Sequence, residues 1–168
     1  MASPAVGSAA PTEGADSLVL CMVTIREATA DDFSGLARLR AAWASEQDPT
    51  TPLDPHFEDA FLSWMQANPR TFFVAEHGNQ LVGMLNLLVF RRMPKPGKET
   101  SCWVYLGNVY VLPPHRNTGV GGRLVEAAIE FSQRVRAARM VLSPSAESQG
   151  FYRRRGFQPA EELSVRKF

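Results

Sequence analysis

The sequence has few cysteines, almost no net charge and no long apolar run, and each shortage removes a class of function. Two cysteines, Cys21 and Cys102, cannot form a disulfide framework or a four-cysteine zinc site, and they favour a reducing, cytoplasmic compartment. The 18 Lys and Arg residues and 17 Asp and Glu residues leave a net charge of +1, which gives no electrostatic basis for binding nucleic acid. No apolar stretch approaches the roughly 20 residues of a membrane span, so no membrane partner is expected. The three histidines share no metal-ligand spacing, so no metal is expected either.

Length and composition indicate one globular domain. With 168 residues, 45% of them hydrophobic and 21% charged, the chain is large enough to bury its own core. Residues 1–17 are mostly Ala, Ser, Pro and Gly, and a disordered, dispensable tail is expected there. The folded domain is expected to cover residues 18–168.

Apolar periodicity predicts a mixed α/β domain, with hairpin strands first and one strand–turn–helix–strand unit in the second half. Strands are expected over residues 22–26, 71–76, 81–90, 102–112, 140–142 and 163–168. Helices are expected from residue 33 up to the proline-containing stretch 47–55, and over 57–67, 120–136 and 145–155.

A glycine-rich turn, Arg116–Arg123, lies between an expected strand and the longest expected helix. Its glycines allow a ligand to approach the backbone, and the unpaired amides of a helix start suit a phosphate, as do flanking arginines. Neither common nucleotide motif fits. A P-loop ends in Gly-Lys followed by Ser or Thr, but Arg123 stands at the lysine position. A dinucleotide fingerprint needs a glycine where Leu124 stands. A tight turn with no ligand is the alternative.

Two segments in this half of the chain together resemble one family. Val109-Tyr110-Val111, two prolines and then Arg116-x-x-Gly119-x-Gly121 are similar to motif A of the GCN5-related N-acetyltransferase (GNAT) family. Downstream, Phe151-Tyr152-x-x-x-Gly156-Phe157 resembles a second family segment, and the likeness extends from about Met22 to the C-terminus. The resemblance implies a single-domain acyl-CoA N-acyltransferase fold: a mixed, mostly antiparallel sheet, flanked by helices, whose central strands splay around acetyl-CoA.

The resemblance also implies a role for individual residues. The backbone of Val109, Tyr110 and Val111 would bind the pantetheine arm, and Tyr152 would protonate the departing thiolate. The pyrophosphate would be held by the turn residues Arg116, Asn117, Thr118, Gly119, Val120, Gly121, Gly122 and Arg123. Ser145 and Ser148 stand where many members carry Asn and Ala, and Ser145 would bond the pantetheine amide with a shorter reach.

The general base is left open by the sequence. Some members use a strand glutamate, but the corresponding strand face here carries Trp103, Tyr105, Gly107 and Val109 and no carboxylate. Glu99, Tyr105 and His115 acting through water are candidates, and so is the absence of any base for an amine that arrives neutral. Simple alternation places Asn108 on the face opposite Tyr105, as a structural polar group.

The expected reaction is transfer of an acetyl group from acetyl-CoA to a primary amine of a small molecule or protein. The alternative is a non-catalytic acyl-CoA-binding module of the same fold. Dimers are common in the family, so a homodimer is a further expectation. The acidic segment 46–54 borders the acceptor site in the family and would favour a cationic amine, whereas Phe57, Phe61 and Trp64 are expected to be helix core.

Overall fold

A computed structural model describes residues 23–166, whose strands form one mixed sheet in the order β1-β2-β3-β4-β5. The strands are β1 (Val23–Glu27), β2 (Thr71–His77), β3 (Gln80–Arg91), β4 (Cys102–Val111) and β5 (Ala137–Val141). Neighbours from β1 to β4 are antiparallel, and β4 and β5 are parallel. This confirms the expected mixed, mostly antiparallel sheet; the expected tail over residues 1–17 lies outside the described residues.

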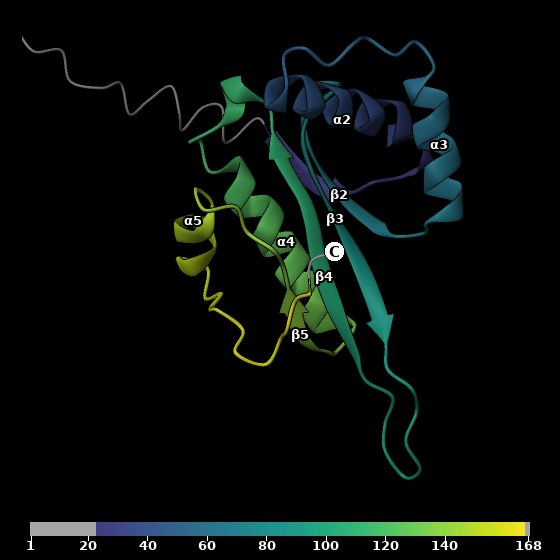
Figure 1. Ribbon diagram of the computed structural model, residues 1–168, viewed down its shortest axis with the longest axis vertical. Helices are drawn as coiled ribbons and strands as arrows, with labels where there is room; N and C mark the ends of the chain where they lie inside the picture. The colour runs from purple at the N-terminus through teal and green to yellow at the C-terminus, as the bar shows by residue number, and fades with distance from the viewer. Residues whose placement is uncertain (1–22, 167–168) are drawn as a thin grey trace, which may run out of the picture.

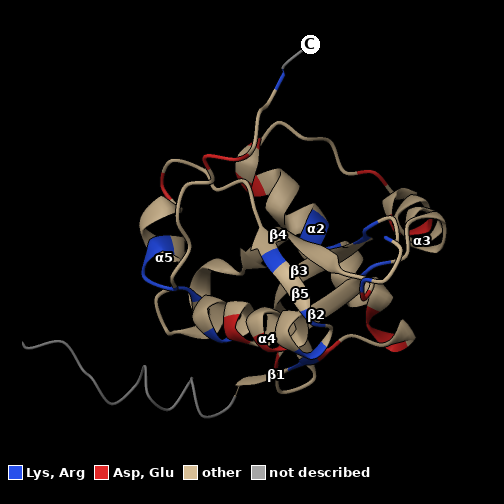
Figure 2. Ribbon diagram, turned by 90° about the horizontal axis from the view of Figure 1, so that it is seen from below, with Lys and Arg blue, Asp and Glu red and all other residues tan. Residues whose placement is uncertain are grey.

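Helices cover both faces of the sheet (Figures 1 and 2). One face carries α2 (Phe33–Gln47) and α3 (Phe57–Ala67), and the other carries α4 (Val120–Arg134), with the short α5 (Gln149–Arg153) beside it. None of the helices over residues 23–166 is long and apolar enough to cross a membrane.

Two apolar cores result from the alternation of side chains along the strands. The core under α4 contains Leu85, Leu87, Val104 and Leu124, all fully buried. The core under α2 and α3 contains Leu36, Phe61, Phe72, Met84 and Tyr110. Because β2, β3 and β4 contribute to both cores, these three strands are packed on both faces of the sheet.

Ion pairs of Arg26 connect the start of α2 to the sheet. Arg26 on β1 donates to both carboxylate oxygens of Asp32 at 2.7 and 2.8 Å and to Glu76 on β2 at 2.7 Å. Asp32 also accepts from the Thr29 amide at 2.8 Å. The hydrogen bonds from Arg26 lower the pKa of Asp32 to about 2.

Two C-terminal elements differ from the sequence-based expectation. The helix expected over 145–155 is only α5, because the Ser145 and Ser148 hydroxyls bond within a turn that precedes it. The strand expected over 163–168 is absent in its described part, residues 163–166, and Val165 is 84% exposed. An ion pair between Arg139 and Glu162 holds this segment near β5 without a backbone ladder.

Candidate active site

The two central strands separate half-way along β4. Pairing begins with Cys102 opposite Ala137 and ends with Tyr105 opposite Val141, where β5 stops. Strand β4 continues to Val111 and beyond Tyr105 pairs, within the described residues, only with β3. Among residues 23–166, its amides and carbonyls on the β5 side therefore pair with no other strand, and Val109, Tyr110 and Val111 belong to this stretch.

A bulge interrupts β4 in the same stretch. Gly107 pairs with Asn86 and Tyr110 pairs with Met84, so an extra residue is accommodated between them. Asn108 has a φ of 56°, in the left-handed region. This conformation places its side chain beside Asn86, whose Nδ2 donates to Asn108 Oδ1 at 2.8 Å.

The bulge overturns the expected orientation of Asn108. A Cβ on Gly107 would meet both the Tyr105 ring and Asn86 Oδ1, so Tyr105 and Asn86 share one face of the sheet. Asn108, bonded to Asn86, lies on that same face rather than opposite Tyr105, because the bulge breaks the alternation.

The glycine-rich turn forms an uncapped helix start close to the end of β4. Asn117 and Gly119 have φ values of 61° and 87°, and no side chain caps α4 at Gly119. The helix dipole and the first amides of α4 therefore favour an anion there. A Cβ on Gly121 would meet Phe151 and Val111 at 3.7 Å, an ordinary contact, so protein packing does not require glycine at this position.

The two arginines of the turn are engaged elsewhere. Arg116 donates to both carboxylate oxygens of Glu46 at 2.7 and 2.6 Å, and its Nε donates to the Val111 carbonyl at 2.8 Å. Arg123 Nη1 donates to the Val23 carbonyl at 2.8 Å. In this structure both guanidinium groups are therefore bonded to protein acceptors, and their expected role beside a phosphate stays a prediction. The Thr118 hydroxyl likewise donates to the His115 carbonyl, and the Val120 side chain is fully buried in the core.

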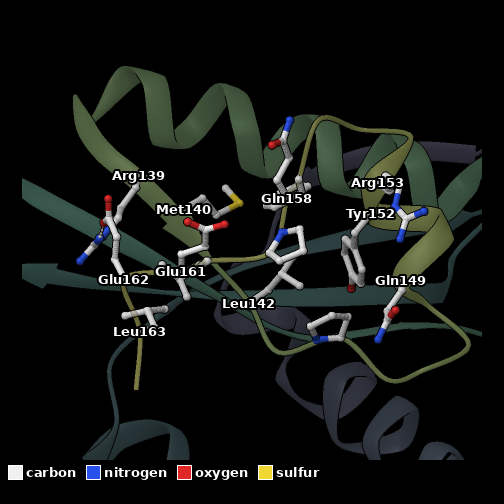
Figure 3. A pocket seen from close by; sticks show the side chains of 15 residues that line it. Arg139, Met140, Leu142, Gln149, Tyr152, Arg153, Gln158, Glu161, Glu162 and Leu163 are labelled. Carbon is white, nitrogen blue, oxygen red and sulfur yellow. Dashed lines mark hydrogen bonds and ion pairs between the residues drawn. The ribbon is translucent and has the colours of Figure 1, made fainter. Parts of the chain in front are cut away.

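Tyr152 projects from α5 into a large cavity of about 760 Å³ (Figure 3). Its ring makes edge contacts with Phe151 and Phe157, at centroid distances of 5.0 and 5.7 Å. Burial is the main reason that the pKa of Tyr152 is raised, so the phenol is protonated at neutral pH. No residue of β4 or of the turn 116–123 lines this cavity, which opens between β5, α5 and residues 157–163.

Arg155 lies between α5 and the start of α4, in contact with Phe151 and next to Gly122. The Arg155 guanidinium lies 3.9 Å from the centre of the Phe151 ring, and Nη1 donates to the Phe151 carbonyl at 3.0 Å. A Cβ on Gly122 would collide with this guanidinium. Gly122 therefore leaves room for the Arg155 guanidinium against the start of α4, and a larger residue there would require that side chain to move.

Comparison with known proteins agrees with this arrangement. The Acetyltransferase (GNAT) family description matches residues 34–157. The chain belongs to the GNAT family. The resemblance stated from its motifs is confirmed, and the family's cosubstrate is the acetyl-CoA expected from the sequence.

Solved structures of other acetyltransferases share the GNAT fold. A putative acetyltransferase from Agrobacterium tumefaciens is 25% identical, with a TM-score of 0.67 over 86% of this chain and 99% of its own. A predicted acetyltransferase from Clostridium acetobutylicum, solved with acetyl-CoA, is 19% identical, with a TM-score of 0.67 over 87% of this chain and 96% of its own. An aminoglycoside N-acetyltransferase in complex with CoA is 21% identical, with a TM-score of 0.65 over 87% and 94%. No curated protein matches the sequence.

Ser145 and Ser148 of this GNAT chain lie in the turn before α5. Ser145 Oγ donates to Ser148 Oγ at 3.1 Å, and Ser148 Oγ donates to the Ser145 carbonyl at 3.1 Å. Their hydroxyls are thus used locally, although Ser145 Oγ retains acceptor capacity.

The three candidate bases lie in different places. Glu99 is exposed in the loop between β3 and β4, outside the strand that carries the bulge. His115 faces His77 with ring centroids 5.3 Å apart, and burial lowers its pKa. Only Tyr105 is adjacent to the bulge, with its ring over Gly107.

A second, smaller cavity of about 290 Å³ opens on the α2–α3 side of the sheet. Its lining includes Phe57, Phe61 and Trp64, which sequence reasoning assigned only to helix core, and Asn86 and Asn108 of the bulge. Helical spacing along α3 identified the aromatic face correctly, but it gave no indication that this face is partly open. The acidic segment 46–54 does not line it: Glu46 is paired with Arg116, and Asp48 accepts from Thr50.

Proposed function

We propose that this GNAT protein is an acetyl-CoA-dependent N-acetyltransferase that acts on a primary amine. The observation that carries the proposal is the separation of β4 from β5 next to an uncapped helix start. It leaves the main chain of Val109–Val111 and the first amides of α4 exposed to one elongated ligand. An acyl-CoA has that form, with a pantetheine amide chain that leads to a pyrophosphate.

Main-chain groups bind the cosubstrate in this proposal. Main-chain groups of the Val109, Tyr110 and Val111 stretch that face away from β3 extend the sheet pattern to the pantetheine arm, apart from the Val111 carbonyl, which accepts from Arg116. The pyrophosphate is held by the amides of Asn117, Thr118, Gly119, Val120, Gly121 and Gly122. Ser145, in the turn before α5, provides a hydroxyl contact through its remaining acceptor capacity, with Ser148 bonded beside it.

The acetyl group is transferred directly. The neutral amine attacks the thioester carbonyl carbon, a C–N bond forms, and the resulting oxyanion accepts hydrogen bonds from bulge amides. When the C–S bond breaks, the Tyr152 hydroxyl donates its proton to the thiolate, and the proton lost by the amine restores it through solvent. The raised pKa of Tyr152 keeps that proton available at neutral pH.

Coenzyme A release tests the proposal against its alternative, a non-catalytic acyl-CoA-binding module. Calorimetry measures acetyl-CoA binding, and a thiol assay measures free coenzyme A with a panel of primary amines. Binding with amine-dependent release supports an enzyme, whereas binding without release from any amine supports the module. A protein that does not bind acetyl-CoA overturns both.

A further inference from the structure

The smaller cavity has an aromatic wall built from three elements. Phe57, Phe61 and Trp64 come from α3, Phe72 from β2 and Met84 from β3. Adjacent rings along α3 are in contact, with centroid distances of 6.1 Å for Phe57–Phe61 and 6.0 Å for Phe61–Trp64. A volume of about 290 Å³ is near the lower limit for small-molecule pockets, roughly 300 Å³, so the wall suits one compact apolar group.

The charge in this cavity is positive. Among residues 23–166, Arg40 of α2 is the only charged residue in the lining, and no Asp or Glu contributes to it. The Nη1 of Arg40 is buried and has no hydrogen-bond partner among residues 23–166, although the guanidinium lies 5.0 Å from the Trp43 ring centre. A buried, unpaired guanidinium donor is costly unless a ligand supplies an acceptor, and a carboxylate is the acceptor that matches it best.

Polar side chains connect the cavity to the bulge of β4. Arg70 Nη1 donates to Asn86 Oδ1 at 3.3 Å, and Asn86 Nδ2 donates to Asn108 Oδ1 at 2.8 Å. Asn86 is 3% exposed, and this chain of bonds holds its amide in one orientation. Asn108 lines the cavity and precedes Val109, so a molecule in the cavity borders the main chain at which the thioester is proposed to lie.

We propose that the acceptor is a small primary amine that carries both a carboxylate and one aromatic or branched aliphatic group. The inference rests on the proposed function and specifies its acceptor. The apolar group occupies the aromatic wall, the carboxylate pairs with Arg40, and the amine lies at the bulge beside Asn108. A polycationic amine such as a polyamine finds no carboxylate in this cavity and meets the charge of Arg40.

Matched amines test the proposal on the unmodified protein. L-Phenylalanine and L-leucine are compared with phenethylamine and isoamylamine, which lack only the carboxylate, and with spermidine, while free coenzyme A is measured. The expected result is a kcat/KM that is about 10- to 100-fold higher for the amines with a carboxylate, the range for a hydrogen bond to a charged group. Equal or faster release with the decarboxylated amines or spermidine would overturn the proposal and leave the acetyltransferase function intact.

Substitution of Arg40 provides the second test. Arg40→Gln should lower kcat/KM for L-phenylalanine and L-leucine, remove the 10- to 100-fold preference for the carboxylate, and leave the affinity for acetyl-CoA unchanged. Arg38→Gln, an exposed arginine on the same helix, is the matched control and should retain the preference. A preference that survives Arg40→Gln overturns the proposal. Acetyl-CoA binding with no release from any of the five amines also overturns it, whereas failure to bind acetyl-CoA at all overturns the proposed function itself.

Discussion

The two sides of β4 are built on different principles. Towards β5 and α4, the candidate cosubstrate site consists of main-chain groups from residues 109–122, close together in the sequence. Towards α2 and α3, the smaller cavity consists of side chains from α2, α3, β2, β3 and β4. A main-chain site accepts many side chains as long as the backbone path is kept, whereas a side-chain site changes its preference with one substitution. The two proposals therefore assign cosubstrate binding and acceptor choice to opposite sides of one strand.

The largest effect is expected at Tyr152, on the cosubstrate side. Tyr152→Phe should lower turnover by about 10²–10⁴-fold and change acetyl-CoA affinity little, because the hydroxyl acts only when the thiolate leaves. Rates of coenzyme A release across pH provide the measurement. Since burial raises the pKa of Tyr152, the wild-type rate should fall only above the ordinary tyrosine value near 10, and the mutant should lack that fall. Full activity with an unchanged profile would remove Tyr152 from the mechanism.

Gly121 tests the main-chain cradle. Gly121→Val should weaken acetyl-CoA binding by about 10- to 100-fold, because a branched side chain keeps a phosphate from the amides. Gly121→Ala is the control for folding: its Cβ meets Phe151 and Val111 at 3.7 Å, so stability should be retained. Calorimetric titration measures the affinities. Unchanged affinity in a folded Gly121→Val protein would place the pyrophosphate elsewhere.

The ion pair between Arg26 of β1 and Asp32 at the start of α2 tests how much α2 depends on its attachment to the sheet. Asp32 is 8% exposed and its pKa is lowered from 3.8 to about 2, so Asp32→Asn should cost about 2 kcal/mol of unfolding free energy at pH 7. A lowered pKa contributes stability above pH 4 that is lost as the pH falls through 2. Urea unfolding of the wild type and Asp32→Asn should therefore differ at pH 7 and converge near pH 2. The exposed neighbour Asp31, changed to Asn, should show no such gap.

The bulge of β4 lies between the candidate cosubstrate site and the smaller cavity. The cost of the positive φ of Asn108 in this bulge can be measured. Asn108→Ala should destabilise the protein by about 1 kcal/mol more than Asn108→Gly, because both lose the bond to Asn86 but only glycine adopts a φ of 56° without cost. Urea midpoints with equal slopes provide the comparison. Equal loss in the two variants would mean that the side-chain bond, and not the backbone conformation, dominates at this position.

The smallest effect is expected at Arg116, whose guanidinium is paired with Glu46. Arg116→Gln should change acetyl-CoA affinity by less than about threefold, and stability by no more than about 1 kcal/mol, as for exposed ion pairs. Both partners are 39% exposed, which is consistent with a weak pair. A tenfold loss of affinity would show that the guanidinium leaves Glu46 and reaches the phosphates, and the contrast between the two sides of β4 would be weakened.

The sequence alone determined the fold, and it predicted where the cosubstrate would bind. Apolar periodicity located β1 to β4, α2, α3 and α4 to within a few residues, because their faces are buried against a sheet. The turn from Val109 to Gly122 was recognisable because strand, glycines and helix start are adjacent in the chain. Domain limits, the roles of individual site residues and a homodimer remain predictions.

Only the tertiary structure decided which side chains meet. Arg116 pairs with Glu46, 70 positions away, and Arg123 bonds to Val23, 100 positions away, so neither partner could be inferred from the motif. The bulge at Asn108, the open aromatic cavity and the missing strand at residues 163–166 likewise depend on contacts between distant elements. The physical reason is that local sequence sets the backbone conformation and the buried face, whereas the free energy of a polar side chain depends on whichever donor or acceptor the fold brings to it.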